Sequence, residues 1–199
     1  MDEVAVPAAY IARANVLEYE ATWRLGADAL ELQGGPASTP DAVMRVPYRE
    51  IVAVRLSYAP SRFDHARYRC DLHMRSGQRL AILSTHYAGI ANFEDRGASY
   101  APFVRALIAR VAEANPAVRL QSGKNVLVYM AEHVFLIVAF ALLVVVLSAF
   151  GPSYLSESST KLLVVVAAIP VLIAYARKNC PRRFRPDGIP DDVLPAAPR

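Results

Sequence analysis

The chain has 199 residues, of which 54% are hydrophobic and 20% charged, and its mean hydropathy is +0.24. These values are too apolar for a purely soluble protein of this size and too charged for one that lies wholly in a membrane. The sequence therefore indicates a chain in two parts. The formal net charge is +4, without the clustered basic face of a nucleic-acid-binding protein, so we expect no nucleic-acid partner.

Cysteine usage and the first residues bear on the compartment. Cys70 and Cys180 lie far apart and do not suggest a disulfide, which fits a reducing environment. Met1-Asp2-Glu3 is neither basic nor followed by an early apolar run, so we expect no cleaved signal peptide.

Residues 8–15 suggest a short helix without a role, and residues 17–32 predict a β-hairpin. Alternation of apolar and polar residues is typical of a strand with one buried face. The apolar members are Tyr19, Ala21, Trp23, Leu25, Leu30 and Leu32. The register that keeps them on one face and forms a favourable charge pair joins Trp23 to Leu32, Arg24 to Glu31 and Leu25 to Leu30.

Further strands are predicted over residues 43–46, 51–58 and 67–85. In the second of these, the residues expected to face inward are Val52, Val54, Leu56 and Tyr58. In the third, a three-residue turn over residues 76–78 keeps the apolar side chains together. The pairs it forms are Met74 with Leu80, Leu72 with Ile82, and Arg75 with Arg79.

The next element, residues 99–114, is predicted to be an amphipathic helix. Its apolar stripe has helical spacing and consists of Tyr100, Phe103, Val104, Leu107, Ile108 and Val111. Ser99 is expected to cap its start, and Asn115-Pro116 to end it.

The order of these elements resembles the pleckstrin-homology-like (PH-like) fold. That resemblance implies an α+β class: an antiparallel β-barrel or sandwich capped by a C-terminal helix. Residues 46–54 and 93–96 resemble short sequence segments of bacterial membrane proteins that join a PH-like domain to two transmembrane helices. A generic two-layer α+β sandwich is the alternative.

A transmembrane hairpin is predicted over residues 125–176. Residues 134–150 and 162–176 are apolar and flank a short polar break, which gives spans of about 128–150 and 159–176. We therefore expect a cytoplasmic PH-like domain over 1–124, the hairpin, and a basic, proline-rich cytoplasmic tail over 177–199.

Positive charge beside the spans predicts the orientation. The tail residues expected to act as topology anchors are Arg177, Lys178, Arg182, Arg183 and Arg185. Both termini should then face the cytoplasm of a multi-pass inner-membrane protein. Residues 189–194 are too rich in proline for a helix, and we expect them to dock either onto their own domain or onto a second protein.

The candidate binding site is a group of arginines on and beside the strand that begins at residue 67. The residues expected to contact a phosphate or an anionic lipid headgroup are Arg62, Arg67, Arg69, Arg75 and Arg79. The alternative is a solvated strand face balanced by Asp64 and Asp71. The spacing of His65, His73, His86 and Cys70 matches no zinc signature, so we expect neither metal nor cofactor.

The sequence contains no catalytic triad, phosphate-binding glycine loop or paired carboxylates at helical spacing, so we expect no enzyme. The leading hypothesis is a non-catalytic membrane protein that presents its PH-like domain as an interaction module. Its expected partners are the lipid bilayer and a protein or anionic lipid. The alternative is an accessory subunit that stabilises a larger membrane protein complex.

Overall fold

The computed structural model describes residues 9–35, 43–60, 67–90, 92–150 and 180–195. By its internal contacts the chain divides into two compact units. The first comprises Met1–Ser122 and Arg182–Arg199, and the second Gly123–Pro181.

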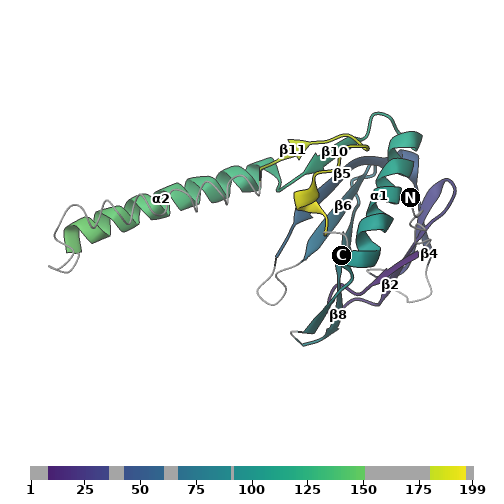
Figure 1. Ribbon diagram of the computed structural model, residues 1–199, viewed down its shortest axis with the longest axis horizontal. Coiled ribbons are helices and arrows are strands. Elements are labelled where there is room, and N and C mark those ends of the chain that lie inside the picture. Colours follow the sequence, from purple (N-terminus) through teal and green to yellow (C-terminus); the bar gives the residue numbers. More distant parts are fainter. Residues whose placement is uncertain (1–8, 36–42, 61–66, 91, 151–179, 196–199) are drawn as a thin grey trace. The chain divides into compact units, whose positions relative to one another are not determined.

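The first sheet of the first unit is four-stranded and antiparallel, with strand order β1-β2-β3-β4. Its strands β2 and β4 are labelled in Figure 1. Its strands are β1 (Ala9–Ala12), β2 (Ala21–Leu25), β3 (Ala29–Gly34) and β4 (Val43–Pro47). The predicted β2–β3 register is confirmed at all three pairs, Trp23–Leu32, Arg24–Glu31 and Leu25–Leu30. The short helix expected over residues 8–15 is wrong, because β1 occupies its first half and pairs with β2.

The second sheet is five-stranded, with strand order β11-β10-β5-β6-β7. Its strands are β5 (Ile51–Tyr58), β6 (Tyr68–Met74), β7 (Arg79–Leu83), β10 (Arg119–Ser122) and β11 (Arg182–Arg183). A single 3-10 turn, η1 (Tyr48–Glu50), leads into β5, and β10 pairs with β5 in parallel. A separate hairpin follows β7 and consists of β8 (Thr85–Gly89) and β9 (Asn92–Asp95).

The predicted β6–β7 register is wrong by two residues. Leu72 pairs with Leu80 rather than with Ile82, and the turn is Arg75-Ser76-Gly77. The Met74 and Gly77 amides close this turn by donating to Gln78 and Met74 carbonyls. Side chains alternate with a period of two, so a two-residue slip keeps the same face buried and the apolar pattern cannot detect it. Gly77, at φ 88°, supplies the left-handed residue that the turn needs.

Helix α1 (Gly97–Ala114) confirms the predicted helix and its buried stripe. The residues with no measurable exposure are Tyr100, Phe103, Val104, Leu107, Ile108 and Val111. They pack in one core with apolar side chains of both sheets. Ser99 does not cap the helix, which begins two residues earlier. The Asp95 carboxylate instead accepts a hydrogen bond from the Gly97 amide.

The chain's C-terminal segment packs on the first unit. Strand β11 pairs with β10, and the 3-10 turn η3 (Asp191–Val193) brings Val193 and Leu194 into the core at 3% and 2% exposure. Residues 189–194 were expected to dock onto either their own domain or a second protein, and the structure shows them docked onto their own domain. The first unit is a mixed α+β fold with a β-sandwich-like arrangement of its two larger sheets.

The second unit contains α2 (Val126–Phe150), a helix of 25 residues. Lys124 forms an ion pair with Glu132 in the second turn. Over the residues that the structure describes, no helix has both the length and the apolar character needed to cross a membrane.

This finding overturns the predicted two-helix transmembrane hairpin. The multi-pass inner-membrane location and the resemblance to two-span bacterial membrane proteins fall with it. The second predicted span, residues 159–176, lies outside the described residues. What α2 presents is exposed apolar surface, with Leu127 77%, Phe135 71% and Ile137 66% exposed.

The docked tail predicts a loss of stability when Leu194 is truncated. Leu194→Ala removes a buried side chain from the core, and we expect the free energy of unfolding to fall by about 2–4 kcal/mol in urea denaturation of the full-length chain. Asp187→Asn, in the exposed turn just upstream, is the control and should leave stability unchanged. Equal stability of the two variants would contradict the docking of the tail.

Candidate functional site

The outer face of the five-stranded sheet gathers basic side chains. The registers place Arg119, Ala53, His73 and Arg79 in one row across the sheet. The next row contains Arg183, Gln121, Arg55, Asp71 and Ala81, and the third Ser57, Arg69 and Leu83. We call this set the basic face: Arg55, Arg69, His73, Arg79, Arg119 and Arg183. Asp71 is the acidic residue that the registers place among them.

The electrostatics of His73 report this crowding of positive charge. Burial lowers the pKa of His73 below its ordinary value, and the neighbouring Arg79 lowers it further. Arg55 and Arg119 act in the same direction, whereas Asp71 raises the pKa. Three arginines of the basic face thus act on one half-buried imidazole, and Asp71 offsets them in part.

Three of the five predicted contact arginines converge on a pocket of about 420 Å³ beside β7. Its basic rim is formed by Arg67, Arg69 and Arg79, and its remaining lining by Ala14, Asn15, Glu18, Trp23, Leu80, Ala81 and Leu83. We call this the β7 pocket. Arg75 lies exposed on the β6–β7 turn and does not line it. Arg62 lies outside the described residues.

Hydrogen bonds hold parts of the rim in place. The Arg67 Nε donates to the Ala59 carbonyl at 3.1 Å, and the Arg69 Nε donates to the Asp71 carboxylate at 2.7 Å. These contacts use one edge of each guanidinium and leave terminal nitrogens for a ligand. The pocket thus combines fixed cations with an apolar floor, where Trp23 and Leu80 are 3% and 4% exposed.

The predicted topology anchors are divided by the structure. Arg182 and Arg183 form β11, and Arg185 is exposed beyond it. Arg177 and Lys178 lie outside the described residues.

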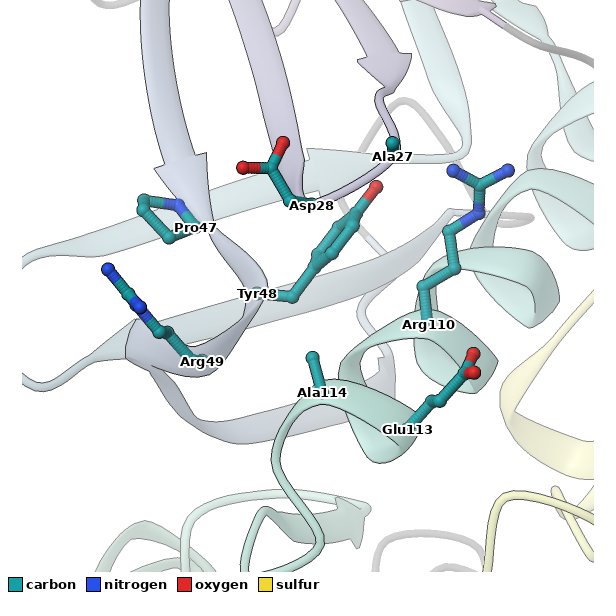
Figure 2. Close-up of a pocket in the computed structure, with 8 residues that line it drawn as sticks. All are labelled: Ala27, Asp28, Pro47, Tyr48, Arg49, Arg110, Glu113 and Ala114. Atoms are coloured by element: carbon teal, nitrogen blue, oxygen red, sulfur yellow. The ribbon is translucent and has the colours of Figure 1, made fainter.

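A second pocket, of about 460 Å³, lies between the β2–β3 turn, η1 and α1. Figure 2 shows Arg110 and Glu113 projecting from α1, Asp28 from the β2–β3 turn, and Tyr48 between them. With Arg49, the lining contains equal numbers of basic and acidic residues, so it attracts neither anions nor cations strongly.

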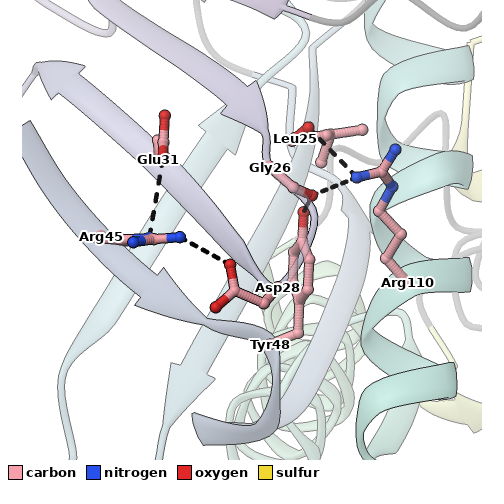
Figure 3. Close-up of polar contacts among 7 residues, drawn as sticks. All are labelled: Leu25, Gly26, Asp28, Glu31, Arg45, Tyr48 and Arg110. Atoms are coloured by element: carbon pink, nitrogen blue, oxygen red, sulfur yellow. Dashed lines mark hydrogen bonds and ion pairs between the residues drawn. The ribbon is translucent and has the colours of Figure 1, made fainter.

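The polar contacts in this second pocket are structural. The Arg110 guanidinium donates to the Leu25 carbonyl at 3.3 Å and also to the Gly26 carbonyl (Figure 3). The Tyr48 hydroxyl donates to the same Gly26 carbonyl at 3.0 Å. These contacts provide hydrogen-bond donors to both carbonyls and tie the helix to the hairpin.

Two potentially reactive side chains, a thiol and a phenol, lie inside the core. Cys70 and Tyr100 are fully buried, and desolvation raises the pKa of each side chain. A thiol that stays protonated is a poor nucleophile. Cys70 faces the core and His73 the outer face, and no group of three potential metal ligands is found among the described residues.

The sequence alone did not place half of the basic face in the candidate site. The alternation over residues 51–58 predicts that Arg55 faces outward, but no predicted strand includes Arg119 or Arg183. Their side chains join the face through the parallel β10–β5 pair and the long-range β10–β11 pair. The only local signal was the arginine content itself, since no short-range pattern predicts a pairing between segments so far apart.

No protein-family model, curated protein or solved structure matches this chain. The basic face and the β7 pocket are therefore the grounds for a function.

The charge of Arg79 should be measurable in the titration of His73. Arg79→Gln should raise the pKa of His73 toward its ordinary value, without fully restoring it because burial is the larger cause. The folded state binds a proton at His73 more weakly than the unfolded state does, because the folded-state pKa is lowered. The stability that His73 contributes is therefore fully present above the ordinary histidine pKa and is lost as the pH falls from that value through the lowered pKa. NMR titration of the imidazole protons measures the shift. Arg75→Gln is the matched control and should leave the pKa of His73 unchanged.

Arg110 is predicted to stabilise the fold rather than bind a ligand. Arg110→Met keeps much of the side chain's apolar bulk but removes both donated hydrogen bonds, and we expect a loss of about 2 kcal/mol in the free energy of unfolding. Arg105→Met, at an exposed position on the same helix, should change stability by less than about 0.5 kcal/mol. Urea denaturation decides, and an unchanged midpoint for Arg110→Met would refute the structural role.

Proposed function

We propose that the protein is a non-catalytic interaction module whose basic face binds an anionic partner. The observation that carries the proposal is the gathering of five arginines and His73 around Asp71 on one side of one sheet. Clustered like charges repel one another, so such a cluster is retained at a cost in stability. A partner that brings negative charge removes that cost.

We further propose that the first unit is a PH-like domain. In chain order, strands β1 to β4 form one sheet, β5 to β7 meander in the next, and α1 follows and buries its stripe in the shared core. This order supports the PH-like assignment over a generic two-layer sandwich. The function does not follow from that assignment, because a fold hosts many functions.

A binding role fits the chemistry of the described side chains better than catalysis. The buried cysteine and tyrosine are inert, and the arginines of the basic face are charge donors without a neighbouring base or nucleophile activated by them. The partner is a protein with an acidic surface or an anionic lipid, since carboxylates and phosphates both match guanidinium groups.

The second candidate is an accessory subunit of a larger protein complex. The exposed apolar side chains of α2 favour it, because apolar surface of this kind is normally covered by another protein.

The test uses the full-length chain, because the C-terminal tail is part of the first unit. Binding of a fluorescent oligo-glutamate and of phosphatidylglycerol vesicles is measured at low and high salt. Reversing two face charges in Arg119→Glu/Arg183→Glu should weaken binding about tenfold, and salt should weaken it further.

The control makes the same charge change elsewhere on the first unit. Arg24→Glu/Arg105→Glu alters two exposed arginines outside the basic face and should bind almost as the parent does. Equal losses in both double variants would show that net charge, not the face, drives binding. Binding to neither probe, with recovery of the chain in a complex of fixed size, would favour the accessory subunit.

A further inference from the structure

Strand β7 is the last strand in the order of the five-stranded sheet, an open edge as far as the structure describes the chain. Its hydrogen-bonding groups can be assigned to its two sides. The Met74 amide donates to the Gln78 carbonyl, and the Ser84 amide donates to the Tyr68 carbonyl, at the two ends of the β6–β7 ladder. Antiparallel pairing alternates, so Leu80 and Ile82 direct their amides and carbonyls toward β6.

It follows that Arg79, Ala81 and Leu83 direct theirs to the open side. One contact checks this assignment independently, since the Tyr10 hydroxyl donates to the Leu83 carbonyl from outside the sheet. For Arg79 and Ala81, the described part of the chain provides no backbone partner beyond β6. An unpaired strand edge is a template for a further strand.

The β7 pocket lies along this same edge. Arg79, Ala81 and Leu83 all line it, together with Arg67 and Arg69. Among the lining residues the single carboxylate is Glu18, which accepts a hydrogen bond from the Asn15 side chain at 2.7 Å. The pocket therefore offers open backbone groups, an apolar floor and three guanidinium groups to one occupant.

We propose that β7 binds an acidic, extended peptide segment of a partner protein as an added antiparallel or parallel strand. Alternate side chains of the added strand fall on opposite faces. Carboxylates on one face reach Arg69 and Arg79, and apolar side chains on the other face cover Trp23 and Leu80. A free phosphate or a lipid headgroup would use the arginines but leave the strand edge and the apolar floor unused.

This proposal rests on the proposed binding function and names its ligand. The probe is a blocked peptide of alternating glutamate and valine, about seven residues long, which is near the usual strand length. It is added to the full-length chain, and amide hydrogen exchange is followed by NMR. Exchange at Arg79, Ala81 and Leu83 should slow about tenfold, whereas Leu80 and Ile82, already paired with β6, should not change.

Two changes remove the added ladder without removing charge. A peptide methylated at the alternate amides that face β7 should bind about tenfold more weakly than its parent. Ala81→Pro removes an outward amide, which spares the β6 ladder, and should weaken binding by a similar factor. Ala81→Ser is the matched control. The methylated peptide keeps the test valid if the proline variant does not fold.

The outcomes distinguish strand addition at β7 from the more general binding of anions by the basic face. Slowed exchange confined to the outward amides, together with loss on methylation, supports strand addition. Peptide binding that is indifferent to methylation, or binding of phosphatidylglycerol vesicles or inorganic phosphate alone, would overturn strand addition while leaving an anion-binding face. Binding of none of these probes would overturn both.

Discussion

Burial of the α1 stripe is the interaction on which the first unit depends. Six side chains of this helix have no measurable exposure, and they lie in one core with residues from both larger sheets. Neither sheet can bury its apolar face alone, and the helix cannot bury its stripe without them. The core also incorporates Val193 and Leu194, so the end of the chain contributes to the stability of a domain whose other elements end at Ser122.

The same alternation that fills the core creates the basic face. In β6, Cys70 and Leu72 point inward, so Arg69, Asp71 and His73 must point outward. Neighbouring strands repeat the division, and their registers bring arginines from four strands besides β6 onto one surface. A surface in which one sign of charge dominates opposes compactness, and this local conflict is characteristic of binding sites.

The two pockets differ in how their arginines are used. Arg110 donates to backbone carbonyls of the β2–β3 turn, which ties its charge to the fold. Arg79 lies exposed on a strand edge where its own backbone groups and those of Ala81 have no backbone partner beyond β6 among the described residues. Pocket volume alone would not distinguish them. The hydrogen bonds distinguish them, because the Arg110 guanidinium is tied to two backbone carbonyls, whereas no contact of this kind is described for Arg79.

The sequence by itself determined the local features that depend on periodicity. The β2–β3 hairpin with its register, the strand at residues 51–58 and the stripe of α1 follow from patterns with periods of 2 and 3.6 residues. It also predicted as contact residues three arginines that line the β7 pocket, Arg67, Arg69 and Arg79. The apolar run at residues 126–150 forms helix α2. Over the residues that the structure describes, no helix has the length and apolar character needed to cross a membrane, so the predicted membrane hairpin is wrong. Only the tertiary structure decided the β6–β7 register, the parallel β10–β5 pair and the docking of the tail. A slip by two residues preserves the buried face, and pairings between distant segments leave no local periodicity, so their energies become apparent only when the chain is folded.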